Sequence, residues 1–538
     1  MSAQFGSRIS PTAVNLPHCA RVPRSCHPER GANGVPGKRF CAWRGVGAES
    51  RDLLFSTPLA KAGVNRRVPR SGLLLARAGA KVRTTRALVV ALTFVLSFLS
   101  AIAAQTPLPE FLPLDAARPV LQTIPCNANG CPSPTITSSD WTAWLQKSDA
   151  QIRQRLDTGE EDSLTNLLRF GVTYTREYRI DDDYLVLYGQ SSLVNAFAEN
   201  RANDLIKALA APGANQGFVE MRAFVEKKGY SLKTPADRAK LKTYLLANLA
   251  RMQKEFLQLR EQAKTNRSQE FQRRGISLDS NLWPDYDLDL TLQSLLDSGK
   301  LKPNSIRRVA IVGPGLDFVN KQEGVDYYPP QITQPFAVLD TLFRLGLAAP
   351  DAVELYTFDI SSRVNLHLGI ARKNAALGQA YTVQLPWYSD GRWTDDFRAK
   401  FTAYWQQLGS RIGQPVAPIP VPQGSPGFAT RAVKIRPEIV SRITPVDMNI
   451  VYQRLPLAPD QRFDLIIGTN IFLYYGGFEQ ALARLNIAAM LQPGAYLLSN
   501  DKLEDAFPAG LDQALTTDIP MTTPPVITDH IYSYRRTP

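Results

Sequence analysis

The second half of the chain alternates short apolar runs with helical stretches, and this alternation constrains the fold more than any other feature. Apolar runs occupy residues 308–312, 353–358, 463–467 and 495–498, and stretches such as 335–347 and 478–491 lie between them. Strands that alternate with helices indicate a parallel sheet with helices on both faces. The sequence therefore predicts a doubly wound, mostly parallel α/β domain over residues 283–538. Residues 526–534 alternate as an edge strand would, and the proline-rich 416–427 reads as an exposed insertion.

Residues 139–280 have helical periodicity instead and predict a mainly α-helical domain. Apolar residues recur at helix spacing over 141–156, a second helix is expected at 163–170, and 184–188 fits either a short strand or a turn of helix. The clearest helix begins near Pro235 and is expected to run to about Arg273. Its apolar stripe favours a core helix over a partner-binding or dimerising one. The stripe consists of Leu241, Leu245, Leu249, Met252, Phe256 and Leu259.

The positive charge of the chain is confined to its first segment. The 538 residues carry a formal net charge of +13, but residues 1–86 hold 16 basic and 3 acidic residues, and the rest holds 46 of each. A body without net positive charge has no broad attraction for phosphate backbones, so binding to nucleic acid is not expected. Residues 1–81 lack any sustained period. They are expected to be a disordered basic extension, or to precede a true translation start near Val82.

An uncharged apolar run at 87–104 follows several basic residues and ends in small residues. This pattern favours a cleaved secretory signal peptide at 82–104, with an uncleaved single-span membrane anchor as the alternative. Either one places the body outside the cytoplasm. The proline-rich residues 105–138 are expected to be a linker. Within it, Cys126 and Cys131 favour a small disulfide loop over a metal site, because two thiolates do not complete a tetrahedral shell.

The body has only two histidines, His367 and His530, which excludes a multi-histidine metal centre. The first predicted strand of the α/β domain leads into the segment GPGLD at 313–317. Glycines in this place let a ligand approach the backbone, although a plain tight turn explains them equally well. Asp359 ends the second strand. There it can accept hydrogen bonds from both ribose hydroxyls of a nucleoside, cap the next helix, or do both.

Residues 463–501 carry the most specific pattern, FDLIIGTNIFLYYGGFEQALARLNIAAMLQPGAYLLSND. The FDLI start, the amphipathic helix and LQPGAYL resemble the class I S-adenosylmethionine (SAM)-dependent methyltransferases. The spacing from FDLI to Asn470 and Tyr474 is similar to that of the chemotaxis-receptor methyltransferases in particular. Together with the GPGLD segment and Asp359, the resemblance covers about 190 residues, 313–501.

This resemblance implies SAM as the cofactor. It implies that Gly313, Gly315 and Asp317 form the glycine loop beside SAM, that Asp359 binds the ribose, and that Asn470 faces the cofactor. The 44 residues from Gly315 to Asp359 exceed the spacing of about 20 in dinucleotide-binding fingerprints, which disfavours an NAD-dependent oxidoreductase. No catalytic residue is assigned, because methyl transfer depends mainly on orienting the nucleophile towards the sulfonium.

The long loop at 318–334 is expected to be a lid, a substrate wall or a structural insertion. Its tyrosines, together with Tyr474 and Tyr475, are candidates for the substrate side of the site. The predicted function is a SAM-dependent methyltransferase acting on an unknown small-molecule or protein acceptor. The alternative is an exported, non-catalytic binding or structural protein on the same scaffold, because a fold does not fix a function.

Overall fold

The structure is a computed structural model. It describes residues 107–124, 132–262, 275–276, 282–317, 326–387, 393–421, 429–503, 509–524 and 526–538. The extension at 1–81, the leader at 82–104 and the pair Cys126 and Cys131 lie outside the described residues, so the predictions for them stay predictions. Among the helices in the described ranges, none has the length and apolar character needed to cross a membrane.

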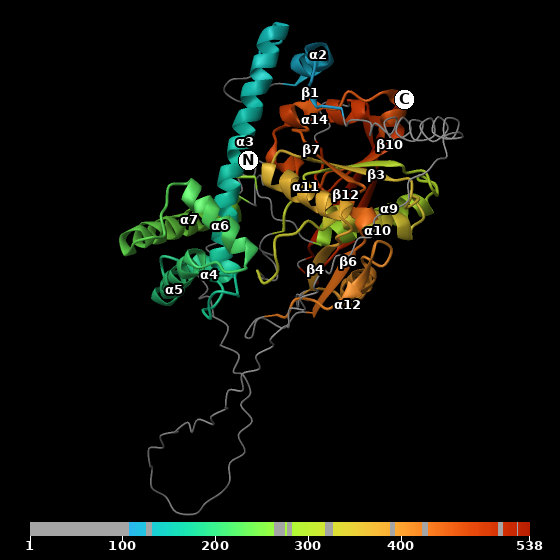
Figure 1. The fold of residues 1–538 in the computed structure, drawn as a ribbon. Helices are drawn as coiled ribbons and strands as arrows, with labels where there is room; N and C mark the ends of the chain where they lie inside the picture. The colour runs from blue at the N-terminus through green and yellow to red at the C-terminus, as the bar shows by residue number, and fades with distance from the viewer. Residues whose placement is uncertain are drawn as a thin grey trace, which may run out of the picture. The chain divides into compact units, whose positions relative to one another are not determined.

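A seven-stranded sheet forms the centre of the α/β domain (Figure 1). The strands are β2 Arg308–Val312, β3 Glu354–Asp359, β7 Ile443–Asp447, β9 Phe463–Ile467, β10 Leu491–Ser499, β11 Leu511–Pro520 and β12 Thr528–Arg536. Their order is β11-β12-β10-β9-β2-β3-β7. Neighbours from β10 to β7 pair in parallel, and β12 runs antiparallel to both β10 and β11. The predicted doubly wound, mostly parallel α/β fold is confirmed.

Alternate residues of the central strands enter two different cores. Val309 and Ile311 of β2 pack with helices α9 Trp283–Asp297, α10 Gln334–Arg344 and α11 Ser362–Ala376. Ala310 and Val312 of the same strand pack on the other face with helix α14 Gly477–Met490. Because both faces are covered, β2 and β9 read in the sequence as nearly continuous apolar runs, with Arg308 and Asp464 as the exceptions near their starts.

Several parts of the α/β domain differ from the sequence-based expectation. The prediction that residues 526–534 form an edge strand was wrong about the position of the strand in the sheet. Strand β12 lies between β10 and β11, and β11 forms the edge. An insertion between α11 and β7 forms a second, antiparallel sheet in the order β4-β6-β5. Its elements are β4 Tyr381–Trp387, α12 Asp395–Gln407, β5 Gly413–Val416 and β6 Ala429–Ile435, followed by α13 Pro437–Val440. The proline-rich 416–427 begins at the end of β5, and residues 422–428 lie outside the described part.

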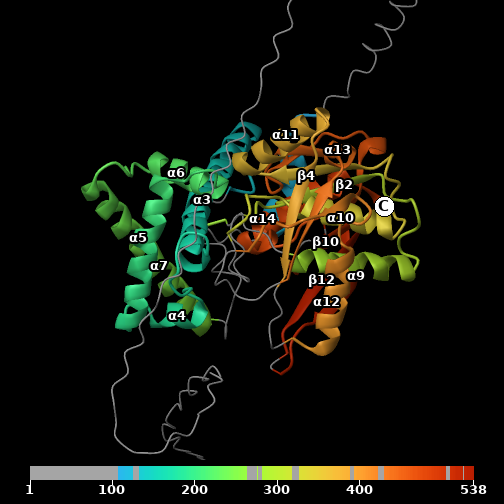
Figure 2. The same cartoon turned by 60° about the horizontal axis from the view of Figure 1, so that its bottom comes forward.

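The helical domain consists of α3 Ser138–Phe170, α4 Asp182–Leu187, α5 Ser192–Ala210, α6 Gln216–Lys227 and α7 Pro235–Gln262. Figure 2 shows these helices packed together. The two helices expected over 141–170 are one helix, α3, and the ambiguous segment 184–188 falls mainly in the helix α4. The apolar stripe of α7 contributes Leu241, Leu245 and Leu249 to the helical core, which confirms the core interpretation.

Helix α3 belongs to two hydrophobic cores. Its first half contributes Trp141, Leu145 and Ile152 to the core beneath α14, whereas Leu164 and Leu168 in its second half enter the core of the helical domain. The α/β core also recruits residues from the expected linker. There β1 Glu110–Phe111 pairs with β8 Gln453–Arg454, and helix α2 Leu114–Thr123 packs on α14. The expected linker 105–138 therefore contains a strand and a helix that pack on the α/β domain. Its high proline content had suggested a linker without such elements.

Candidate nucleoside-binding site

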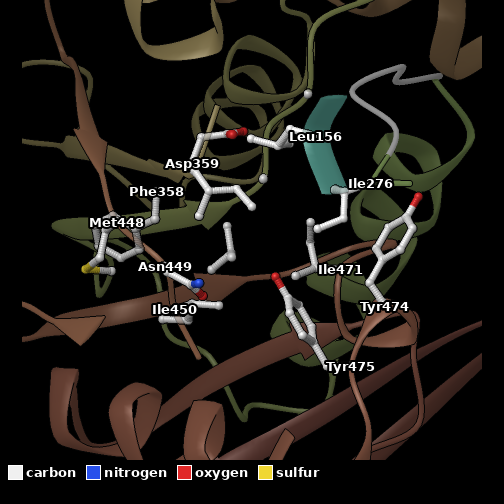
Figure 3. A pocket seen from close by; sticks show the side chains of 14 residues that line it. Leu156, Ile276, Phe358, Asp359, Met448, Asn449, Ile450, Ile471, Tyr474 and Tyr475 are labelled. Carbon is white, nitrogen blue, oxygen red and sulfur yellow. The ribbon is translucent and has the colours of Figure 1, made fainter. Parts of the chain in front are cut away.

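A pocket lies at the carboxyl ends of β2, β3, β7 and β9 (Figure 3). Its volume is about 490 Å³ when the space open to solvent at its mouth is included. Strand β2 has β3 on one side and β9 on the other, so the chain order reverses here. Open α/β sheets bind their ligands at this switch point, outside the carboxyl ends of the strands. The position of the pocket in the fold is therefore the expected position of a ligand.

The glycine loop after β2 forms one wall of the pocket. Gly313 and Gly315 both line it and both have positive φ angles, +64° and +72°. A Cβ on Gly313 would lie 2.1 Å from Cδ1 of Ile471, which lines the pocket from the loop after β9. Gly313 also donates its N–H to the carbonyl of Phe358, at 2.8 Å. Only glycine fits this combination of backbone conformation and close approach.

Asp359 ends β3 inside the same pocket and is 6% exposed. Its carboxylate accepts a 2.7 Å hydrogen bond from the N–H of Ser361, and its carbonyl accepts one from Met448. Burial raises the pKa of Asp359 to about 7; the nearby Asp447 adds to the rise, and Ser361 and Arg153 oppose it. The carboxyl group therefore changes its charge near neutral pH.

The loop after β7 supplies residues that sequence reasoning missed. Met448, Asn449 and Ile450 line the pocket opposite the glycine loop. The signal was weak because β7 reads ITPVD, and its proline interrupts the apolar run. In the structure, Met448 donates its N–H to the carbonyl of Asp359 at 3.2 Å, which joins the two loops.

The loop after β9 brings two predicted tyrosines to the pocket. It includes the short helix η2 Phe472–Tyr474. Tyr474 and Tyr475 both line the pocket, and the Tyr475 hydroxyl points towards its centre (Figure 3). Burial raises the pKa of Tyr475, so this hydroxyl stays protonated at neutral pH and can donate a hydrogen bond. Both tyrosines therefore share one pocket with Asp359.

Two predicted site residues lie elsewhere. Asn470 forms two hydrogen bonds with the side chain of Asn500: its side-chain Oδ1 accepts from Nδ2 of Asn500 at 2.9 Å, and its backbone N–H donates to Oδ1 of Asn500 at 2.7 Å. Asp317 accepts hydrogen bonds from the Tyr328 hydroxyl at 2.9 Å and from Gln331 at 3.1 Å. Neither Asn470 nor Asp317 is among the residues that line the pocket.

The helical domain contributes to the pocket as well. Leu156 of α3 and Ile276 line the side that faces away from the sheet. The segment 275–276 crosses α3 at very close range, since a Cβ on Gly159 would lie 1.8 Å from the carbonyl oxygen of Ile276. No local sequence pattern pointed to this contribution, because it depends on a crossing of two distant segments.

The residues present fit a nucleoside. Ile360, Met448 and Ile450 offer apolar surface to a flat base, and Asp359 offers a carboxylate to vicinal hydroxyls. Gly313 and Gly315 present backbone without a side chain at the wall of the pocket. Among the described residues, no group of three or more histidine, cysteine or acidic side chains is arranged to hold a metal ion.

Comparison with known proteins gives structural matches only: no family model matches the chain, and no curated protein matches it. The N-methyltransferase NodS from Bradyrhizobium japonicum WM9 is 10% identical, over 48% of this chain and 98% of that one, with a TM-score of 0.22. Magnesium protoporphyrin IX methyltransferase (ChlM) from Synechocystis PCC 6803, solved with bound SAM, is 12% identical over 47% and 80%, with a TM-score of 0.22. TrmN from Thermus thermophilus is 13% identical over 47% and 52%, with a TM-score of 0.23.

The α/β domain has the doubly wound, mostly parallel fold described above. At these identities and TM-scores, the chain's own pocket is the feature from which a function can be inferred. The closer similarity of residues 463–474 to chemotaxis-receptor methyltransferases stays a prediction. In the α/β domain, Gly313, Gly315 and Asp359 line one pocket.

Proposed function

We propose that this chain is a SAM-dependent methyltransferase, with its nucleoside pocket at the carboxyl ends of β2, β3 and β7. One observation carries the proposal: the buried Asp359 lines the same apolar pocket as the two glycines that follow β2, Gly313 and Gly315. A buried carboxyl group needs hydrogen-bonding partners. The two ribose hydroxyls of SAM are donors of the right kind for the ionised form.

The residues of the pocket would bind and orient the cofactor. Asp359 would accept hydrogen bonds from the ribose, and the loop after β7 would cover the adenine with Met448 and Ile450. SAM supplies an electrophilic methyl group on its sulfonium, so the protein has to place an acceptor in line with it and exclude water. Tyr475 directs a protonated hydroxyl into the pocket and is our candidate for orienting bound groups there.

The test is calorimetric titration of the protein from Gln105 onwards with SAM and with S-adenosylhomocysteine (SAH). We expect micromolar binding, and a loss of about tenfold or more in affinity for Asp359→Ala, which corresponds to about 1.4 kcal/mol. Asp351→Ala is the matched control, because Asp351 is exposed in a turn before β3. A folded protein that binds neither nucleoside would overturn the proposal and leave a binding or structural protein on the same scaffold.

A further inference from the structure

The side of the pocket away from the sheet is held by helix α3, which reaches the loops after β3, β7 and β9. Leu156 lines the pocket directly. Arg155 donates from Nη1 to the carbonyl of Tyr474 at 3.0 Å. Asp149 accepts a hydrogen bond from Nδ2 of Asn449 at 2.8 Å. One helix from outside the sheet therefore fixes three of the loops that form the pocket.

Arg153 makes the most specific of these contacts. Its Nη1 donates both to the carbonyl of Ile360, 207 positions later, at 3.0 Å and to Oδ1 of Asp447 at 2.7 Å. Its Nε donates to Asp149 at 2.9 Å, which fixes the guanidinium plane. Ile360 directly follows Asp359, and Asp447 ends the neighbouring strand β7. The guanidinium thus bridges the two loops between which the adenine is expected to lie.

We propose that Arg153 is a positioning residue for nucleoside binding: it sets the spacing of the loops after β3 and β7 and supplies the positive charge that keeps Asp359 able to accept hydrogen bonds. The proposal rests on the proposed function and names a residue outside the sheet and its loops on which that function depends. A planar guanidinium with several fixed donors suits a bridge to a carbonyl and a carboxylate, and a lysine at this place offers charge without that geometry.

The electrostatic part follows from the groups that face Asp359. Asp447 lies on β7, Arg153 lies on α3 beside Asp149, and Tyr475 follows β9. Asp447 raises the pKa of Asp359 and Arg153 lowers it, against the large rise caused by burial. Removing the guanidinium therefore removes an opposing positive charge and leaves Asp447 without its ion pair. Both changes favour the protonated form of Asp359.

The experiment measures SAH affinity between about pH 5.5 and pH 8.5 for the wild type, Arg153→Met, Arg153→Lys and Lys147→Met. In the wild type, affinity should rise as the pH rises through about 7 and then level off, because ionised Asp359 accepts the ribose hydroxyls. In Arg153→Met, the midpoint of this rise should move to higher pH, and affinity at pH 7 should fall by about tenfold or more. Arg153→Lys should keep a midpoint near that of the wild type and still bind more weakly.

Lys147→Met is the matched control, because Lys147 is an exposed residue of the same helix and its loss changes the net charge equally. A folded Arg153→Met protein with the wild-type midpoint and affinity would overturn the proposal. If Arg153→Met does not fold, Arg153→Lys decides the matter, since wild-type affinity in that variant would exclude a positioning role for the guanidinium.

A second readout needs no ligand and separates this proposal from the proposed function. The thermal midpoint of the wild type, compared with that of Asp359→Asn, should fall as the pH rises from about 4 to 7, because the folded state holds the Asp359 proton longer than the unfolded state does. In the Arg153→Lys and Arg153→Met backgrounds the same comparison measures whether the guanidinium acts on Asp359. In Arg153→Met, the thermal midpoint relative to the matching Asp359→Asn protein should continue to fall above pH 7, and in Arg153→Lys it should not. This result supports an effect of the guanidinium on Asp359 even if SAH fails to bind. Identical curves in all three backgrounds contradict it.

Discussion

Gly313 and Ile471 lie so close together that a β-carbon on Gly313 would be 2.1 Å from Cδ1 of Ile471. The two residues belong to the loops after β2 and β9, on the two strands where the chain order reverses. Their contact closes the base of the pocket between these strands. Ile471 can therefore take this position at the pocket only because residue 313 has no β-carbon.

Gly313→Ala should lower both stability and nucleoside affinity. A left-handed backbone costs a residue with a side chain about 1–2 kcal/mol, and Ile471 has to move away from the new methyl group. Urea unfolding and SAH titration measure the two effects. Gly346→Ala is the matched control, because Gly346 has a φ of +65° and no atom within 4 Å of its hypothetical Cβ. This variant should be less stable than the wild type and should keep the wild-type affinity for SAH.

Gly159→Ala should lower stability although alanine favours a helix. A Cβ at this position in α3 would lie 1.8 Å from the carbonyl oxygen of Ile276, and overpacking of this kind costs about 1–3 kcal/mol. Gly369→Ala should change the stability in the opposite direction. Gly369 lies in α11 with nothing within 4 Å of its Cβ position, so alanine there should stabilise the protein by about 0.5–1 kcal/mol. Chemical denaturation of both variants decides the point, and equal shifts would contradict the close crossing at Gly159.

Asp326→Ala should weaken the attachment of the helical domain to the α/β domain. The Asp326 carboxylate accepts hydrogen bonds from the N–H of Val172 at 2.8 Å, the N–H of Thr173 at 3.1 Å and the Thr173 hydroxyl at 2.8 Å. Losing the acceptor leaves these donors unsatisfied, at a cost of about 1–3 kcal/mol. Hydrogen exchange should show faster exchange at Val172 and Thr173. Unchanged protection at both amides would show that the bonds contribute nothing.

Asp285→Asn should be more stable than the wild type in alkaline solution. Asp285 lies buried in α9, and burial raises its pKa to about 8. The unfolded chain releases this proton near pH 4, so the folded wild type loses stability as the pH rises from about 4 to 8, by up to about 1.4 kcal/mol per pH unit. Asparagine removes this loss. Thermal unfolding at pH 5 and pH 9 tests it: the advantage of Asp285→Asn should grow with pH, and a constant difference would contradict the buried neutral carboxyl group.

The sequence predicted the elements whose environment is uniform. Strands β2 and β9 are covered on both faces, so their apolar runs matched the structure to the residue. Strand β7 contains Pro445 and β11 is largely polar, so neither gave a strand signal. Helix α2 was hidden by the prolines around it, although its buried residues recur at helix spacing.

The candidate site was predictable only where one segment decides the geometry. Gly313 directly follows β2 and Asp359 ends β3, and their positions at the switch point come from strand order alone. Leu156 and Ile276 reach the pocket through a crossing of α3 with a distant segment, which no local pattern encodes. Asn470 has the expected place in the chain, but its side chain pairs with Asn500, a partner 30 residues further on.

The meeting of Gly159 with Ile276 has an architectural consequence. The chain contributes α2 and the first half of α3 to the α/β core, leaves to build the helical core, and is back beside α3 at Ile276. The helical domain is thus an insertion whose two junctions touch. Chain ends that lie this close together are the usual condition for grafting one domain into another. The helices between these junctions are therefore exchangeable in principle, whereas α2 and the first half of α3 form part of the core beside the sheet.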